Sequence, residues 1–235
     1  MSTNEPTRTL PAPLKKVISG GIPTSMIVAI IPVCATLNII GGYVHTALHL
    51  PVYIDMIGTA VAAILLGPWY GALTGLITNL VLALISGPTY LAFAIVNVLG
   101  GIVWGFGIHK WKMGRSIPRF FLLNVIVALI LTVVVAPLTI LVYGGATGSG
   151  QDTVTAVFVA AGQQLVVSVF SSSLLTTLAD KIIAGFVALA IIEAMPMSFR
   201  GRADVVHASP KAGVLYALAG VAIGVVMVVG YQLLV

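Results

Sequence analysis

The residues best suited to chemistry are charged and amide side chains inside otherwise apolar segments. Asp55 precedes a long apolar run, Asn79 lies in the next apolar segment, and Asp180 and Lys181 are adjacent late in the chain. A charged side chain at the start of a membrane helix is energetically unfavourable, so its presence indicates a functional role. Amides and charges together favour binding of a polar small molecule.

A second group of candidates adds aromatic surface. Phe93, Asn97 and Trp104 recur at spacings of four and seven, so they share one face of a helix. Rings supply stacking area and amides fix orientation, which suits a flat heterocyclic ligand. The predicted substrate-binding residues are Tyr53, Asp55, Asn79, Asn97, Trp104, Gln164, Asp180 and Lys181.

The charged candidates also have a structural interpretation. Asp55 and Lys181 could pair with each other and so solve a folding problem rather than bind a ligand. Asp180 and Lys181 are neighbours in sequence, so on a helix they point in different directions. We therefore expect that these two do not simply neutralise one another.

The amides and rings have alternatives as well. Trp104 could anchor a helix at the membrane interface, a depth that tryptophan favours. Asn79 and Asn97 could hydrogen-bond between helices. His45 and His49 are four apart, which would suit two metal ligands on a helix, but a third ligand is lacking.

Catalytic signatures are absent from the sequence. It contains no phosphate-binding P-loop, no His-Glu-x-x-His motif and no Gly-x-Ser-x-Gly elbow. Cys34 is the single cysteine, which excludes a disulfide within the chain. We expect neither an enzyme nor a metal or cofactor site.

Membrane helices are the elements that must position the candidate residues. Of 235 residues, 59% are apolar and only 7% are charged, whereas soluble domains carry about 25% charged residues. Apolar segments of about twenty residues recur, as helical spans require. The composition predicts an all-α integral membrane protein.

The basic pI near 9.5 does not indicate nucleic-acid binding, because the positive charges form short clusters beside apolar segments.

The apolar segments predict the domain organisation. We expect a cytoplasmic tail over 1–22, a six-helix membrane core over 23–197, a basic cytoplasmic loop over 198–211 and an additional C-terminal transmembrane helix over 212–235. The core spans are predicted near 24–43, 53–66, 69–85, 90–108, 120–143 and 177–195. Residues 154–172 are expected to form a re-entrant or surface-lying helix, which would place Asp180 and Lys181 at the head of the sixth span.

The distribution of positive charge predicts the orientation. Ten of the eleven Lys and Arg residues fall in the tail, in the 109–119 loop and in the 198–211 loop, and only Lys181 falls elsewhere. The positive-inside rule then places these segments and the N-terminus in the cytoplasm. Contact with membrane lipid follows from the composition.

Small residues are spaced for close helix packing. Gly71 and Gly75 form one small-xxx-small pair. A second stripe in the last apolar segment consists of Gly213, Ala217, Gly220 and Gly224. Both patterns favour packing within the chain, with contact to another subunit as the alternative.

Residues 53–79 resemble the second and third helices of S components of energy-coupling factor (ECF) transporters. The matching features are the Leu65-Leu66-Gly67-Pro68 turn and the Gly-rich segment that follows it. Asp180-Lys181-Ile182-Ile183, followed by an apolar span ending near Pro196, is similar to the last core helix of some of these proteins. The resemblance extends over about residues 24–197.

The resemblance implies a function and a set of partners. An S component is a six-helix membrane protein that captures a vitamin or related micronutrient. It docks on a transmembrane coupling subunit served by two ATP-binding cassette (ABC) ATPases in a prokaryotic cell membrane. It topples in the membrane to release its cargo, and its first loop closes over the ligand. The site residues carried over by the matched segments are Asp55, Asn79, Asp180 and Lys181.

Two features depart from the S-component pattern. The Ala-xxx-Ala docking surface of the first helix is not reproduced by the spacing of Ala29, Cys34 and Ala35. The helix predicted after Ser198 is additional to the six-helix core. The alternative function is a stand-alone secondary carrier or facilitator for a small heterocyclic solute, with Asp55 or Asp180 as a proton-coupling carboxylate.

Overall fold

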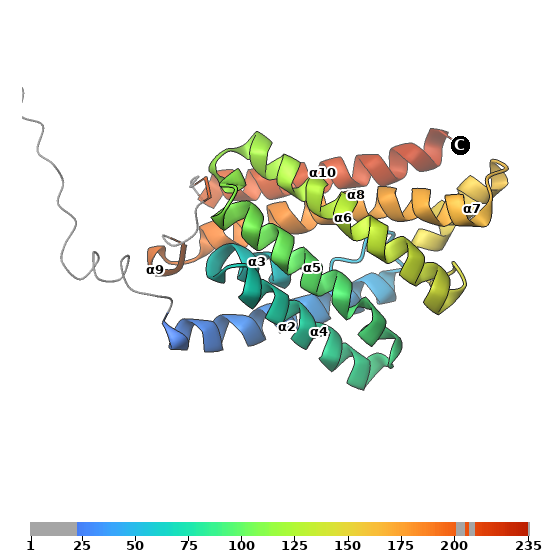
Figure 1. Ribbon diagram of the computed structural model, residues 1–235. Coiled ribbons are helices and arrows are strands. Elements are labelled where there is room, and N and C mark those ends of the chain that lie inside the picture. Colours follow the sequence, from blue (N-terminus) through green and yellow to red (C-terminus); the bar gives the residue numbers. More distant parts are fainter. Residues whose placement is uncertain (1–22, 201–204, 207–209, 235) are drawn as a thin grey trace, which may run out of the picture.

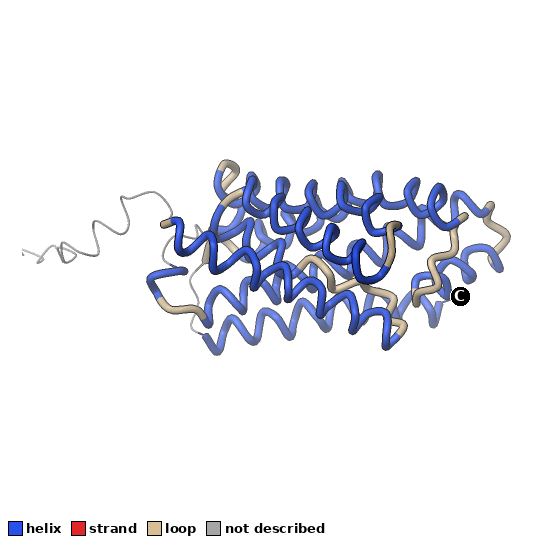
Figure 2. The backbone as a smooth tube through the Cα atoms, turned by 90° about the horizontal axis from the view of Figure 1, so that it is seen from below, coloured by secondary structure: helices blue, strands red, loops and turns tan. Residues whose placement is uncertain are grey.

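The computed structural model describes residues 23–200, 205–206 and 210–234. The described residues form helices and no strand. The helices are α2 (Thr24–Leu48), α3 (Ile57–Leu66), α4 (Pro68–Ser86), α5 (Thr89–His109), the 3-10 turn η1 (Met113–Arg115), α6 (Ile117–Tyr143), α7 (Gln151–Ala160), α8 (Leu165–Ala194), α9 (Met197–Arg200) and α10 (Pro210–Leu234). The long helices run side by side along one bundle axis (Figures 1 and 2). α9 lies at one end of the bundle and α7 at the other (Figure 1).

Five helices among the described residues are long and apolar enough to cross a membrane: α2, α4, α5, α6 and α8. Large apolar side chains on their outer faces are exposed, for example Leu84 at 87% and Leu141 at 80%. Such faces suit lipid, because lipid tails are as apolar as leucine. The prediction of an all-α membrane protein is confirmed at this level.

The second predicted span differs from the prediction. α3 begins at Ile57 and has only ten residues, about 15 Å of helix against a hydrocarbon core of about 30 Å. All ten residues of α3 are buried, so it is a core element rather than a lipid-facing span. The preceding residues 49–56, light blue in Figure 1, are not helical and run back along the bundle.

The long region after α6 also differs from the prediction. A short helix is present, but α7 ends at Ala160, and Gly162 adopts a positive φ of 84° that breaks the helix. α8 then runs without interruption for 30 residues. Asp180 therefore lies near the middle of α8, about 22 Å from its start, and not at the head of a span.

Glycines let α4 and α5 approach closely. A Cβ atom added at Gly101 would lie 2.4 Å from the backbone carbonyl carbon of Gly71, and one added at Gly105 would lie 2.3 Å from the Pro68 Cα. Real Cβ atoms do not approach backbone this closely, so only glycine fits. Gly71, of the predicted small-residue pair, thus packs within the chain.

The C-terminal helix uses the same device. A Cβ atom at Gly220 would lie 2.7 Å from the Phe186 side chain, and one at Gly224 would lie 2.6 Å from Ile183. Both neighbours belong to α8. The glycine stripe of α10 therefore packs against α8 of the same chain.

The described basic side chains other than Lys181 gather at one end of the bundle. The tail 1–22 and residues 201–204 and 207–209 of the predicted basic loop lie outside the described residues. At the end where α5 stops and α6 and α10 begin lie Lys110, Lys112, Arg115, Arg119, Arg200 and Lys211. The described loops after α2, α4 and α6, at the opposite end, contain no Lys or Arg.

Candidate functional site

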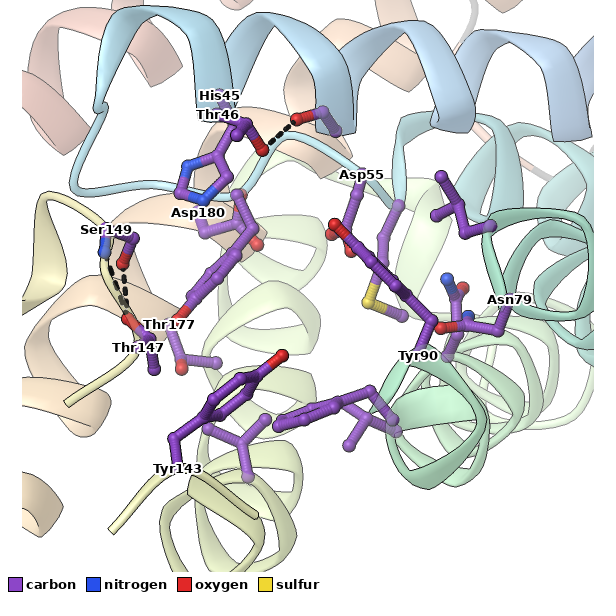
Figure 3. Close-up of a pocket in the computed structure, with 18 of the residues that line it drawn as sticks. His45, Thr46, Asp55, Asn79, Tyr90, Tyr143, Thr147, Ser149, Thr177 and Asp180 are labelled. Atoms are coloured by element: carbon purple, nitrogen blue, oxygen red, sulfur yellow. Dashed lines mark hydrogen bonds between the residues drawn. The ribbon is translucent and has the colours of Figure 1, made fainter. Parts of the chain in front are cut away.

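A cavity of about 200 Å³ lies among α2, α4, α5, α6 and α8, where residues 49–56 run back along the bundle (Figure 3). Pockets for drug-sized ligands typically measure about 300–1,000 Å³, so this space suits a small molecule. Six of the predicted site residues line it: Tyr53, Asp55, Asn79, Asn97, Asp180 and Lys181. The cavity therefore joins the two distant charged segments of the sequence.

The segment 49–56 forms one wall of the cavity in a strained conformation. Ile54 has a φ of 53°, which is unfavourable for a β-branched residue. Its backbone N–H donates a hydrogen bond to Oδ1 of Asp180 at 2.8 Å. A carboxylate in the middle of α8 thus holds the strained segment against the helix.

Asp180 also forms an ion pair with its neighbour Lys181. The Lys181 ammonium donates to Oδ2 of Asp180, and the Lys181 and Asp180 side chains are only 5% and 2% exposed, respectively. The prediction that adjacent residues on a helix would not neutralise one another is wrong. The flexible four-carbon stem of lysine lets the ammonium fold back onto the preceding carboxylate.

Asp55 is the remaining charged group in the cavity wall. It is half-buried and lies beside the open space in Figure 3. No described side chain hydrogen-bonds to its carboxylate or lies within ion-pair distance of it. Lys181 and His45 attract Asp55 and Asp180 repels it, but the ion pair of Lys181 is with Asp180. The alternative of an Asp55–Lys181 pair is therefore not what the structure contains.

A network centred on Asn38 fixes the start of α3 beside the cavity. Asn38 Oδ1 accepts the backbone N–H of Gly58 at 2.7 Å and of Thr59 at 3.3 Å. Its amide donates to Oγ1 of Thr59 at 2.9 Å and of Thr78 at 3.0 Å. These bonds satisfy N–H groups that a helix start leaves unpaired. Asn38 is not among the predicted site residues, although it is an amide in an apolar segment, the same signal that identified Asn79.

Asn79 and Asn97 line the cavity and also have partners inside the protein. Asn79 donates to the backbone oxygen of Gly75 at 3.1 Å, within its own helix. Asn97 accepts from the Thr59 hydroxyl at 2.6 Å, which links α5 to α3. The predicted role between helices is therefore seen for Asn97 and not for Asn79.

Trp104 and Gln164 do not line the cavity. Trp104 is fully buried and donates from Nε1 to Oδ1 of Asn124 on α6 at 2.8 Å. It is thus a core residue, neither an interfacial anchor nor a cavity residue. It lies about 10 Å further along α5 than Asn97. Gln164 is exposed and directly precedes α8, and it is not among the residues that line the cavity.

Aromatic rings line the cavity: Phe93, a candidate from its helix face, and Tyr90 and Tyr143, which the sequence did not single out. Phe93 stacks on Tyr143, with ring centroids 5.8 Å apart and an angle of 29° between the rings. Tyr90 and Tyr143 lie on different sides of the open space in Figure 3, and the Tyr90 side chain extends toward Asp55. Tyr90 and Tyr143 lie at the ends of α5 and α6, where the sequence signals only a helix boundary.

The loop before α7 covers one side of the cavity. Asp152 fixes this loop by accepting the backbone N–H groups of Thr147 at 2.9 Å and Gly148 at 2.7 Å. Gln151 accepts from the Tyr53 hydroxyl at 2.8 Å and donates to Ser173 on α8 at 3.0 Å. Gln151, which is not among the predicted site residues, thereby connects the loop before α7 to the segment 49–56 and to α8.

None of the protein-family models, curated proteins or solved structures compared with this chain matches it. The kind of protein is therefore defined by its structure alone. It is a bundle with five helices of membrane-spanning length that encloses a small cavity with aromatic, amide and charged side chains.

Proposed function

We propose that this chain is the substrate-capture subunit of an uptake system for a vitamin or related micronutrient. The observation that carries the proposal is the cavity. It holds an ion pair, a carboxylate without an ion-pair partner, amides and aromatic rings in the interior of an apolar bundle. Charges inside a membrane protein are expensive and are retained where they serve a ligand or an ion.

The resemblance to ECF S components supplies the partners in this proposal. The chain would load its ligand, dock on a transmembrane coupling subunit and release the ligand when two ABC ATPases hydrolyse ATP. The system would act in the cell membrane of a prokaryote. The positive-inside rule favours a cytoplasmic location for the end of the bundle that carries Lys110 and Arg119.

A second candidate function is a stand-alone carrier driven by a proton gradient. The observation that favours it is α3, a half-length helix preceded by a strained non-helical segment. Discontinuous helices beside buried carboxylates occur at the substrate sites of secondary transporters. In this version Asp55 would exchange a proton as the ligand binds.

Ligand capture is tested by native mass spectrometry of the purified full-length chain. We expect a small molecule to remain bound at a stoichiometry of one and to be lost in the cavity variant Asn79→Leu. The matched control, Leu73→Asn, places a polar side chain on an exposed position of the same helix and should retain the molecule. Absence of a bound molecule from wild-type protein in every preparation would contradict the capture proposal.

Uptake into membrane vesicles separates the two functions. Vesicles are prepared from cells that express the chain with or without an ECF coupling subunit and its ATPases. We expect accumulation of the co-purified molecule only with the ATPases and ATP. Accumulation by the lone chain, abolished when the proton gradient is collapsed, would establish the carrier instead.

A further inference from the structure

The charges around the cavity do not balance. Besides the imidazole of His45, whose Nδ1 lies 2.9 Å from the backbone oxygen of Val52, the acidic and basic side chains in its wall are Asp55, Asp180 and Lys181. Lys181 and Asp180 neutralise one another in their ion pair. One negative charge, that of Asp55, is left without an ion-pair partner among the described residues.

The surroundings of Asp55 offset that charge only in part. Asp55 lies just before α3, and the start of a helix carries a partial positive charge. The N–H groups of Gly58 and Thr59 are, however, already taken by Asn38. A half-buried carboxylate without an ion-pair partner is less favourable than a paired one, and a ligand that brings a positive charge supplies the partner.

The remaining wall is suited to a flat organic cation. Tyr90, Phe93 and Tyr143 line the cavity with Asp55, and Tyr90 and Tyr143 lie on different sides of it (Figure 3). The face of an aromatic ring attracts a cation within about 6 Å of its centre. Rings also supply the stacking area that a planar ligand needs.

A bare metal ion fits this wall poorly. Among the described residues, no group of three or more His, Cys, Asp or Glu side chains could hold a metal ion. The cavity volume of about 200 Å³ also far exceeds the roughly 30 Å³ that one water molecule occupies in the liquid. A small ring compound uses both the space and the aromatic surface.

We infer that the ligand of this cavity is a small aromatic compound with a single positive charge, whose cationic group pairs with Asp55 between the rings of Tyr90 and Tyr143. The inference rests on the proposed capture function and specifies its substrate class. Asp180 and Lys181 stay paired and act on the wall through Ile54, so they leave the charge of the ligand to Asp55.

The test uses three water-soluble probes that share one ring and differ in charge: nicotinate, nicotinamide and the cation 1-methylnicotinamide. Binding to the purified full-length chain in lipid nanodiscs is measured by calorimetry. We expect the cation to bind about tenfold or more tightly than either other probe, equivalent to about 1.4 kcal/mol. Equal binding of the three, tighter binding of nicotinate or nicotinamide, or no binding of the cation would overturn the inference.

Two variants assign the preference to Asp55. Asp55→Asn keeps the shape of the side chain and removes its charge, so the advantage of the cation should disappear while nicotinamide binding stays within about threefold of wild type. Glu5→Gln makes the same change of charge in the N-terminal tail and should keep the full preference. A cation preference that persists in monodisperse Asp55→Asn protein would assign it to another group and overturn the role of Asp55.

The charge inference and the capture function fail in different ways. If uptake requires this chain but a neutral or anionic probe binds best, the charge assignment is wrong and capture stands. If 1-methylnicotinamide binds selectively but purified protein never carries a small molecule and cells lacking the chain lose no uptake, the capture function is wrong and the charge assignment stands.

Discussion

Asp180 serves two partners with one carboxylate. Oδ2 receives the ammonium of Lys181, and Oδ1 receives the backbone N–H of Ile54 from the strained segment beside α3. Both side chains of the ion pair are almost fully withdrawn from solvent. Removing one member of such a pair leaves an uncompensated buried charge, which costs more than the pair itself contributes.

We therefore predict that Lys181→Met destabilises the protein by about 3–5 kcal/mol. The free energy of unfolding in detergent, followed by circular dichroism, measures the effect. The double variant Asp180→Asn/Lys181→Met should recover part of the loss, because it removes both charges. A single variant as stable as wild type would show that the ion pair does not hold in solution.

The side-chain amide of Asn38 caps the start of α3. Asn38→Ala leaves the N–H groups of Gly58 and Thr59 without their acceptor in a buried position. Each unsatisfied group costs about 1–3 kcal/mol, so we expect a loss of stability and faster hydrogen exchange at these two amides. The control Ser86→Ala removes only an exposed contact to Tyr43 and should change neither. Unaltered exchange at Gly58 and Thr59 would contradict the capping role.

At the scale of elements, the short helix α3 is what creates the cavity. A full-length span would fill the interior with side chains from end to end, whereas α3 covers about 15 Å and leaves the rest to residues 49–56. Its ten residues are buried among α2, α4, α5 and α8. Glycines make room for this extra layer, because they let α4 approach both α3 and α5.

We predict that Gly101→Ala destabilises the bundle by about 1–3 kcal/mol. The new Cβ would meet the backbone of Gly71 and Ala72 at 2.4–2.5 Å, so α4 and α5 must move apart. Gly230→Ala is the matched control, since nothing lies within 4 Å of its Cβ position and alanine favours helix by about 1 kcal/mol over glycine. Thermal unfolding of both variants tests the packing, and equal midpoints would contradict it.

On the scale of the whole molecule, the bundle has chemically different ends. Apart from Lys181, the described basic side chains lie at the end of α5, in α9 and near the starts of α6 and α10, and the cavity cover near α7 has none. From this asymmetry the positive-inside rule predicts an orientation in which the loop before α7 lies outside the cell. A ligand would then enter from the outer side.

Cysteine labelling tests this orientation in intact cells. Cys34 is buried, at 4% exposure, and is replaced by serine. Thr153→Cys and Lys110→Cys then place single thiols at exposed positions near opposite ends of the bundle. A membrane-impermeant maleimide should label Thr153→Cys directly and Lys110→Cys only after permeabilisation. The reverse pattern would invert the orientation, and labelling of both in intact cells would contradict a membrane-spanning bundle.

The sequence predicted the site residues that are polar or charged inside apolar segments, where such side chains are energetically unfavourable. Asp55, Asn79, Asp180 and Lys181 stand out because polar groups in apolar segments are expensive, and all four line the cavity. Tyr90, Tyr143 and Gln151 carry no such cost at segment ends, so nothing in the sequence distinguished them. Trp104 was misplaced because a shared helix face does not say how deep along the helix a cavity reaches.

Composition and the recurrence of apolar segments of about twenty residues by themselves determined an all-helical chain with membrane-length segments, since such segments satisfy their backbone in lipid as helices. Glycine spacing marked Gly71 and the stripe in the last helix for close packing, whereas the structure showed that their neighbours belong to the same chain and added Gly101 and Gly105. Tertiary structure alone decided that residues 49–56 run back along the bundle and that Asp180 lies in mid-helix. It also decided that Lys181 pairs with Asp180 and so leaves Asp55 without an ion-pair partner in the described part of the chain. The reason is physical, because charge pairing depends on distances between atoms. Folding brings Asp55, which is far away in the sequence, into the same cavity wall as Asp180 and Lys181, and only the folded geometry decides which carboxylate the lysine pairs with.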